Sequence, residues 1–219
     1  MRKSLQTASF SALVIFVLAS CSTSGKQDEY HDWQKRNEDF ISGISAKADK
    51  SITPDEAVEG DLFRILQYDM DPSKELSISN YVYCEVIQSG YVLTGNIESP
   101  EFKRIGESGS GHPILTDSIS IHYRGRLMPT DEHPDGFIFD QSYNTPEANP
   151  FLSVPKEFVV SGLVKGMTTA LQNMSEGDAW RLYIPYQLGY GSSNRNEIPA
   201  YSTLIFDVTL VKFWTPEDF

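Results

Sequence analysis

Cysteine is scarce in this chain of 219 residues, which contains Cys21 and Cys84 and no other. Neither cysteine belongs to a CxxC pair or to a cluster with histidine, so the sequence contains no ligand set typical of a zinc or iron–sulfur site. Cys84 lies in the apolar run YVYCEVI, and we interpret it as a small core residue and not as a reactive thiol.

Basic residues are also few: 18 Lys and Arg stand against 30 Asp and Glu, for a formal net charge of −12. A protein that binds a phosphate backbone needs a basic face, so this balance argues against a nucleic-acid partner. The hydrophobic share of 40% is ordinary for a globular protein, and the length suffices for one or two domains.

Long hydrophobic runs are missing as well. The run FSALVIFVLA at residues 10–19 is too short to span a bilayer and fits the core of a signal peptide that covers residues 1–20. The following Leu18-Ala19-Ser20-Cys21 resembles a bacterial lipobox, in which Cys21 is the site of lipid attachment. This resemblance predicts a lipoprotein of the bacterial cell envelope, anchored in the outer membrane on its periplasmic or surface face. An ordinary secretory signal is the alternative.

Residues 21–79 are expected to form a tether and a mostly helical N-terminal extension. Within residues 28–50, apolar side chains recur at helical spacing among charged ones: Tyr30, Trp33, Phe40, Ile41 and Ile44. Such a helix usually packs against its own domain, and a homodimer formed through it is the alternative. Residues 51–72 are interpreted as irregular or short helix.

The second part of the chain alternates between strand patterns and turns. Strands are predicted at residues 79–88, 118–127, 137–142, 180–184 and 204–211, from the period-2 alternation of apolar residues. Residues 91–113 look like an inserted loop. In the strand at 118–127, Tyr123 shares a face with Ile119 and Ile121, while His122 points the other way and is interpreted as a surface residue.

One helix is predicted in this part, over residues 161–174. The residues Leu163, Met167, Ala170, Leu171 and Met174 form a single apolar stripe, Ser161 is placed to cap the start and Gly177 follows the end. One short helix among several amphipathic strands favours an α+β fold. The last two strands flank residues 186–202, a loop rich in aromatic residues, which is where a binding site is expected.

Five blocks in this order resemble the FKBP-type peptidyl-prolyl cis-trans isomerases: IHYRGRL (121–127), FIFDQSY (137–143), FVVSGLVKGMTTALQNMSEGD (158–178), WRLYIPYQLGYG (180–191) and IPAYSTLIFDVTLV (198–211). The resemblance implies a domain over residues 80–219 in which a bent antiparallel β-sheet wraps around one short α-helix.

The resemblance also implies a pocket. It assigns Tyr123 to the pocket wall, Asp140 to a carboxylate beside it, and Leu163 to the floor, where many members have tryptophan. Val159 and Val160 match the aliphatic pair before the helix, with the Val160 backbone N–H as a donor to substrate. The remaining pocket residues on this reading are Phe139, Tyr190, Ile198 and Phe206.

The activity implied is prolyl isomerisation that assists the folding of exported proteins. It acts by desolvation and by binding the twisted X-Pro amide, so no metal or other cofactor is expected. The expected partners are proline-containing polypeptides and macrolide inhibitors. Two alternatives stay open: a catalytically weak chaperone or protein-binding module with the same pocket, and an interaction protein that works through residues 28–50.

Overall fold

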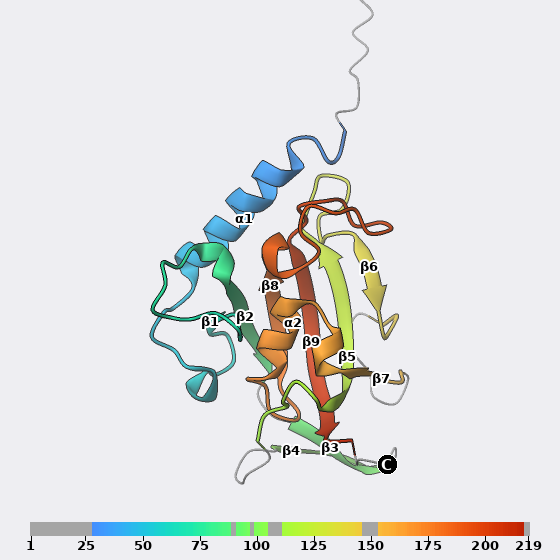
Figure 1. Ribbon diagram of the computed structural model, residues 1–219. Helices are drawn as coiled ribbons and strands as arrows, with labels where there is room; N and C mark the ends of the chain where they lie inside the picture. The colour runs from blue at the N-terminus through green and yellow to red at the C-terminus, as the bar shows by residue number, and fades with distance from the viewer. Residues whose placement is uncertain (1–27, 89–90, 97–98, 105–110, 146–152, 217–219) are drawn as a thin grey trace, which may run out of the picture.

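The computed structural model describes residues 28–88, 91–96, 99–104, 111–145 and 153–216 (Figure 1). The predicted signal peptide and the predicted lipid-attachment residue Cys21 lie outside these residues. In the described ranges, no helix is both long enough and apolar enough to cross a membrane.

Seven antiparallel strands form the main sheet, in the order β1-β2-β8-β9-β5-β6, with β7 also paired to β5. Their bounds are β1 (Leu62–Leu66), β2 (Tyr81–Gln88), β5 (Ser118–Leu127), β6 (Ile138–Gln141), β7 (Lys156–Val159), β8 (Ala179–Ile184) and β9 (Leu204–Trp214). Two α-helices accompany them, α1 (Trp33–Lys47) and α2 (Lys165–Leu171). The predicted α+β class is therefore confirmed.

Strand β1 was not predicted, because residues 51–72 were interpreted as irregular or helical. Its five residues, LFRIL, pair with β2 from Leu62 opposite Glu85 to Leu66 opposite Tyr81. The sheet therefore extends into the predicted N-terminal extension. A hairpin of β3 (Tyr91–Asn96) and β4 (Ser99–Arg104) forms a second, two-stranded sheet, so the first part of the predicted loop at 91–113 is strand.

Strand β5 pairs with three other strands of the sheet. One edge pairs with β9 along its whole length, and the other edge is shared, with β7 on its first half and β6 on its second. This sharing is possible because residues 142–155 carry the chain from β6 to β7 without entering the sheet in their described parts. As a result, three strands meet along β5.

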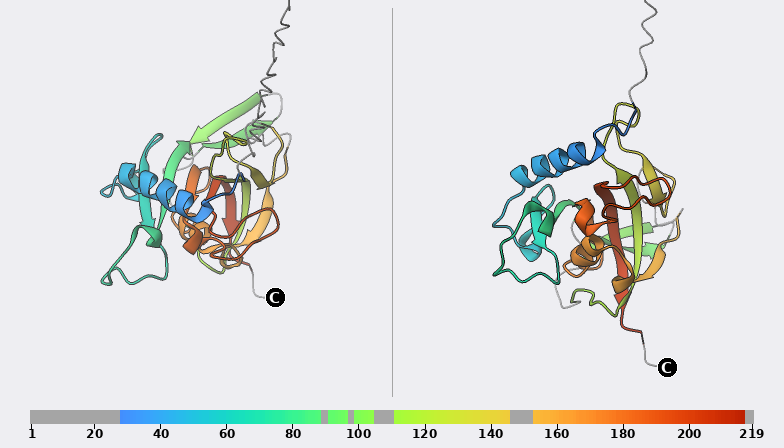
Figure 2. Two further views of the ribbon diagram at one scale, coloured as in Figure 1. Left: turned by 90° about the horizontal axis from the view of Figure 1, so that it is seen from above. Right: turned by 45° about the horizontal axis from the view of Figure 1, so that its top comes forward.

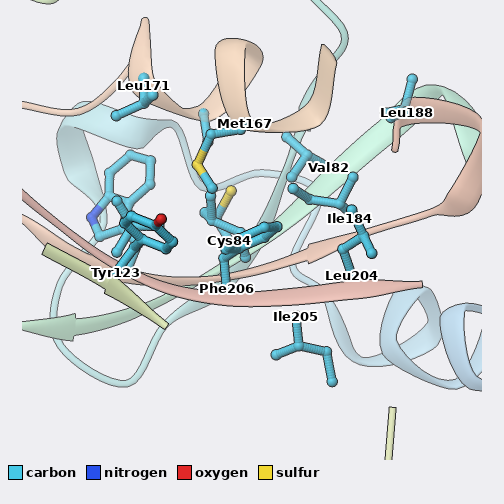
Figure 3. Packing of buried hydrophobic residues seen from close by; sticks show 14 of the residues in the cluster. Val82, Cys84, Tyr123, Met167, Leu171, Ile184, Leu188, Leu204, Ile205 and Phe206 are labelled. Carbon is cyan, nitrogen blue, oxygen red and sulfur yellow. The ribbon is translucent and has the colours of Figure 1, made fainter. Parts of the chain in front are cut away.

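Helix α2 packs on one face of the sheet. Met167 and Leu171 are buried there, and Figure 3 shows Met167 pointing from the helix toward Phe206 on β9, while Ile205 points away on the opposite side. Gly166 permits this close approach, since a Cβ built on it would meet Ile184 Cγ2 of β8 at 2.4 Å.

Helix α2 is shorter than the predicted helix over 161–174. Ser161 lies in the separate 3₁₀ turn Val160–Gly162, and Val164 occupies the N-cap position without a side-chain cap bond, so the predicted cap at Ser161 is wrong. The apolar stripe is confirmed in part: Met167, Ala170, Leu171 and Met174 are buried, whereas Leu163 precedes the helix and is half-buried.

Helix α1 covers the opposite face of the sheet at its β1–β2–β8 end (Figure 2). Ile41 and Ala48 pack with the buried Tyr83 of β2, and Phe40 contacts the ring of Tyr183 on β8. The prediction of a helix within residues 28–50 is confirmed, with a later start: Asp32 before it has a left-handed φ of 49°.

Two single-residue interpretations have different outcomes. Cys84 is fully buried, and burial raises the pKa of its thiol far above the ordinary value, as expected for an inert core residue. His122 was interpreted as a surface residue, and this is wrong, because its exposed fraction is 4%. It does point away from Tyr123, but Tyr143 covers it with a T-shaped ring contact, and burial lowers the pKa of the imidazole.

Candidate functional site

A cavity of about 670 Å³ opens on the α2 side of the sheet. Strands β5, β6, β7 and β9 supply its walls, the start of α2 its floor, and residues 186–203, here called the roof loop, its cover. The residues that line it are Ile121, Tyr123, Phe139, Asp140, Phe158, Gly162, Leu163, Val164, Met167, Tyr190, Arg195, Asn196, Glu197, Ile198 and Phe206.

The aromatic wall depends on a glycine. Phe139 of β6 and Phe206 of β9 meet edge to face, with ring centroids 5.4 Å apart. Both rings lie over Gly125 of β5, where a Cβ would come within 2.5 Å of the Phe139 ring and 2.7 Å of the Phe206 ring. Tyr123, two residues earlier on the same face, makes a further edge contact with Phe158 at 5.9 Å.

Tyr123 also carries the polar part of the wall. Its hydroxyl donates to Asp140 Oδ2 at 2.6 Å and accepts from Lys156 Nζ at 3.1 Å, and Lys156 lies 3.4 Å from Asp140 Oδ1. Burial and then the bond to Asp140 raise the pKa of Tyr123. The hydroxyl therefore stays protonated at neutral pH, and its proton is committed to the carboxylate. This arrangement fixes the plane of the Tyr123 ring.

The floor differs from the prediction. Val159 is 45% exposed and lies opposite Ser118 of β5, on the other side of β7 from the lining residue Phe158. Val160 is fully buried in the core, and its N–H donates to the Asp117 carbonyl at 3.0 Å, so this amide is not available to a ligand. Neither residue lines the cavity, and both assignments are wrong.

The aliphatic pair that precedes the helix is Leu163–Val164, four residues later along the chain. Leu163 does line the cavity, but as part of this pair and not as its floor. Met167, in the first turn of α2, forms the floor instead. Among the described residues no protein acceptor is found for the Val164 N–H, so this amide, and not that of Val160, is available as a donor at the cavity.

The roof loop brings Tyr190 and Ile198 over the cavity, as predicted from the sequence blocks. A tight turn positions Ile198: the N–H of Arg195 donates to the Ile198 carbonyl at 2.9 Å, and the reciprocal bond measures 2.8 Å. Asn196 within this turn has a φ of 46°, a conformation that asparagine tolerates better than most residues. Arg195, Asn196 and Glu197 at the rim were not predicted.

Seven of the nine predicted site residues are therefore brought together: Tyr123, Phe139, Asp140, Leu163, Tyr190, Ile198 and Phe206. Two of the missed lining residues, Val164 and Met167, follow from where α2 begins, which the sequence pattern leaves undecided. Had the helix been predicted from 165 and not from 161, the pair before it would have been Leu163–Val164.

The chemistry open to this cavity is limited. Its lining contains no cysteine, histidine or serine, and nowhere in the described parts of the chain do three or more His, Cys, Asp or Glu residues gather in a way that could hold a metal ion. The buried imidazole of His122 lies on the other face of the sheet. What the cavity offers is an apolar enclosure with a few hydrogen-bonding groups at its edge.

Residues 109–211 match the sequence profile of the FKBP-type peptidyl-prolyl cis-trans isomerases. The macrophage infectivity potentiator of Trypanosoma cruzi is 42% identical over 112 residues, which are 50% of this chain and 50% of that protein. The FKBP-type 22 kDa peptidyl-prolyl cis-trans isomerase of Escherichia coli K12 is 35% identical over 113 residues, 51% of this chain and 48% of that protein. The chain thus spans about half the length of these curated relatives.

Solved structures agree in fold. The crystal structure of a peptidyl-prolyl cis-trans isomerase from Pseudomonas syringae pv. tomato DC3000 superposes with a TM-score of 0.50 at 24% identity, covering 86% of this chain and 98% of that one. FkpA from Escherichia coli has a TM-score of 0.50 at 21% identity, over 84% of this chain and 60% of that one. At these identities the likeness concerns the fold alone.

Proposed function

Since residues 109–211 form a domain of the FKBP-type peptidyl-prolyl cis-trans isomerase family, we propose that the protein catalyses the cis-trans isomerisation of X-Pro bonds in polypeptides. The observation that carries this proposal is the cavity itself: an aromatic and aliphatic wall that contains Tyr123, Phe139 and Phe206, with charged and hydrogen-bonding groups at its edge.

The physics of the reaction fits such a cavity. Twisting the X-Pro bond breaks the resonance of the amide, with a barrier of about 18–20 kcal/mol. In the twisted state the C=O is less polar than in the planar ground state. A site that excludes water therefore favours the twisted form over the planar one, and this difference lowers the barrier. No bond is made or broken, so the reaction needs no nucleophile.

The donors at the edge hold the substrate in place. The proline ring would enter between Phe139, Phe206 and the floor at Met167, where the lining is apolar. The free N–H of Val164 and the hydroxyl of Tyr190, for which no partner is recorded among the described residues, would donate to substrate carbonyls on either side of the bond. Asp140 acts through Tyr123, whose hydroxyl it holds at 2.6 Å.

The test is a prolyl-isomerase assay on residues 22–219 with a proline-containing peptide, together with the variant Phe139→Ala. We expect the parent protein to accelerate isomerisation, and the variant to lose about 30-fold in kcat/KM, corresponding to about 2 kcal/mol of transition-state stabilisation. Phe139 is half-buried at the cavity edge, so circular dichroism should show an intact fold. Full activity in the variant would remove Phe139 from the site.

A second candidate function is supported by the floor. Met167 replaces the aromatic floor that the resemblance leads one to expect, and a flexible thioether encloses a substrate less rigidly than a fixed ring. A catalytically weak module that binds proline-containing chains would then use the same cavity. Binding of such peptides without rate acceleration would favour this candidate. Displacement of the peptide by a macrolide inhibitor would place both ligands in the cavity.

The cellular setting is proposed from the sequence. The hydrophobic run at 10–19 and Cys21 support a lipid anchor in the bacterial cell envelope, with exported proteins as the folding clients. Cys21→Ser should release the protein from the membrane fraction, and retention there would contradict the anchor. A homodimer through residues 28–50 stays a prediction, and sedimentation of the protein with and without these residues tests it.

A further inference from the structure

Helix α1 contacts both ends of the roof loop, here called its roots: the first root is Tyr186 and the second is Ser202–Thr203. Trp33 Nε1 donates to Ser202 Oγ at 2.8 Å, and Thr203 N–H donates to Asn37 Oδ1 at 2.7 Å. At the other root, Tyr186 donates from its hydroxyl to Glu38 Oε1 at 3.2 Å. These bonds join residues that are 148 to 169 positions apart in the chain.

The contacts at the second root are buried. The exposed fractions are 6% for Trp33, 1% for Asn37, 3% for Ser202 and 0% for Thr203. Asn37 also donates to the Trp33 carbonyl at 2.7 Å, so its amide is held at both ends and its oxygen is aimed at Thr203. Buried polar pairs of this kind fix a geometry, because a partner that moves away leaves an unsatisfied group behind.

The connection continues from the root into the cavity. Ser202 Oγ donates to the carbonyl of Pro199 at 2.7 Å, and Pro199 follows the cavity residue Ile198. Tyr201 has a φ of 63°, a left-handed conformation that is strained for a tyrosine. Its N–H donates to the Gly191 carbonyl at 2.9 Å, beside the cavity residue Tyr190. The surrounding contacts must hold this strained residue in place, and α1 supplies those at its neighbour Ser202.

We propose that α1 positions the roof loop over the cavity. Trp33 and Asn37 of α1 hold the loop at the distance from the cavity walls at which Tyr190 and Ile198 close over a bound substrate. The proposal rests on the proposed function, since it concerns the same site. Trp33 and Asn37 are absent from the cavity lining and act through Ser202 and Thr203, so they are positioning residues.

A positioning role has a specific kinetic signature. The turn at Arg195–Ile198 is closed by its own hydrogen bonds, so loss of the α1 contacts should leave its shape intact and change its distance from the walls. Tyr190 and Ile198 hold the bound chain from its roof side in the ground state and in the twisted state alike, whereas Phe139, Phe206 and Met167, which exclude water from the twisted bond, stay in place. A displaced roof loop therefore weakens the binding of the planar ground state and of the twisted state by the same amount. Such a uniform loss of binding raises KM and leaves kcat nearly unchanged.

The experiment compares three variants of the protein in the prolyl-isomerase assay. Asn37→Ala removes the acceptor for Thr203, and Trp33→Phe removes a single N–H donor while keeping an aromatic ring. Lys35→Ala is the matched control on the same helix, since its side chain is 74% exposed. We expect KM to rise about tenfold in Asn37→Ala and about threefold in Trp33→Phe, with kcat within about twofold of the parent and no change in the control. A KM in Asn37→Ala equal to that of the control would overturn the proposal.

Amide hydrogen exchange on the same proteins separates this proposal from the proposed function. In Asn37→Ala, exchange should accelerate at residues 186–203 while the amides of β5 and β9 keep the parent's protection. If the parent protein shows no isomerase activity, the proposed function fails, and the exchange pattern alone decides the positioning role. Acceleration spread over the whole sheet, or none in the roof loop, then refutes it.

Discussion

Consecutive side chains of strand β9 lie on opposite faces of the sheet, and these two faces have different roles. Phe206 faces α2 and lines the cavity, whereas Asp207 on the opposite face binds two guanidinium groups, Arg126 at 2.7 Å and Arg181 at 2.6 Å. The same alternation runs through β8, where Arg181 and Tyr183 face away from the buried Leu182. Because strand side chains alternate, each neighbouring strand contributes to both regions.

The two faces differ in how their side chains are paired. On the charged face, Tyr183 donates to Glu85 at 2.9 Å, and Arg181 lies between Glu85 and Asp207. On the cavity face, the apolar rings of Phe139 and Phe206 border an open volume. Binding a ligand requires apolar surface that is not covered by the rest of the fold, and the cavity face provides it. The charged face contributes hydrogen bonds and ion pairs within the protein, on the other side of the same strands. Substitutions on one face should therefore change stability, and on the other activity.

The largest effect is expected from Asp207→Ala on the charged face. It leaves two partly buried guanidinium groups without their shared carboxylate, and we expect a loss of about 3 kcal/mol in the free energy of unfolding. Asp69→Ala is the control, because its pair with Lys165 is exposed and should contribute less than about 1 kcal/mol. Urea unfolding measures both. Activity per folded molecule should be unchanged, and a large fall in kcat/KM would break the contrast between the faces.

Gly125→Ala tests the cavity face with a single added methyl group. The new Cβ would overlap the rings of Phe139 and Phe206, so both must move into the cavity. We expect kcat/KM to fall about 30-fold, or about 2 kcal/mol. The matched control is Gly43→Ala on α1, where a Cβ meets nothing within 4 Å. Equal activity in the two variants would show that the ring positions over Gly125 do not matter.

High pH should weaken the charged face. Burial, and then the charge of Glu85, raise the pKa of Tyr183 to about 12 from its ordinary value near 10. A folded-state pKa above the unfolded one stabilises the protein fully below pH 10, and this contribution is lost as the pH rises toward 12. After allowance for partial exposure we expect a loss of about 1–2 kcal/mol between pH 9 and pH 11.5 in urea unfolding. Tyr183→Phe should show a smaller loss over the same interval, and an identical pH dependence would exclude Tyr183 as the source.

The sequence predicts both faces well where alternation is regular. The strands at 118–127, 180–184 and 204–211 were predicted from alternation alone and are confirmed. Alternation cannot say what covers a face, however. His122 was placed on the correct side of β5 and still misjudged, because Tyr143, 21 positions away, buries it. Strand β1 was missed for a related reason, since its pairing with β2 is not visible in the five residues LFRIL.

The error at the cavity floor has a local cause. Two aliphatic pairs, Val159–Val160 and Leu163–Val164, precede the apolar stripe of α2, and either satisfies the pattern of a pair before the helix. The choice depends on where the helix begins, and helix ends are weakly determined by local sequence. Here the 3₁₀ turn at Val160–Gly162 comes first, and α2 begins only at Lys165. Val160 therefore points into the core, and Met167 lies at the cavity floor.

The smallest effect, and the sharpest comparison of the two faces, comes from a pair of matched variants. Tyr123 and Tyr183 each donate a hydroxyl proton to a carboxylate, at 2.6 Å to Asp140 on the cavity face and at 2.9 Å to Glu85 on the charged face. Tyr123→Phe keeps the ring and frees it to tilt, so we expect kcat/KM to fall about fivefold, or about 1 kcal/mol.

Tyr183→Phe removes a bond of the same kind and should lower the free energy of unfolding by about 1 kcal/mol without changing kcat/KM. The isomerase assay and urea unfolding at pH 7 measure both properties for both variants. If the two variants change activity equally, the bond to Asp140 does not orient the cavity, and Asp140 has no role beyond holding a hydroxyl group.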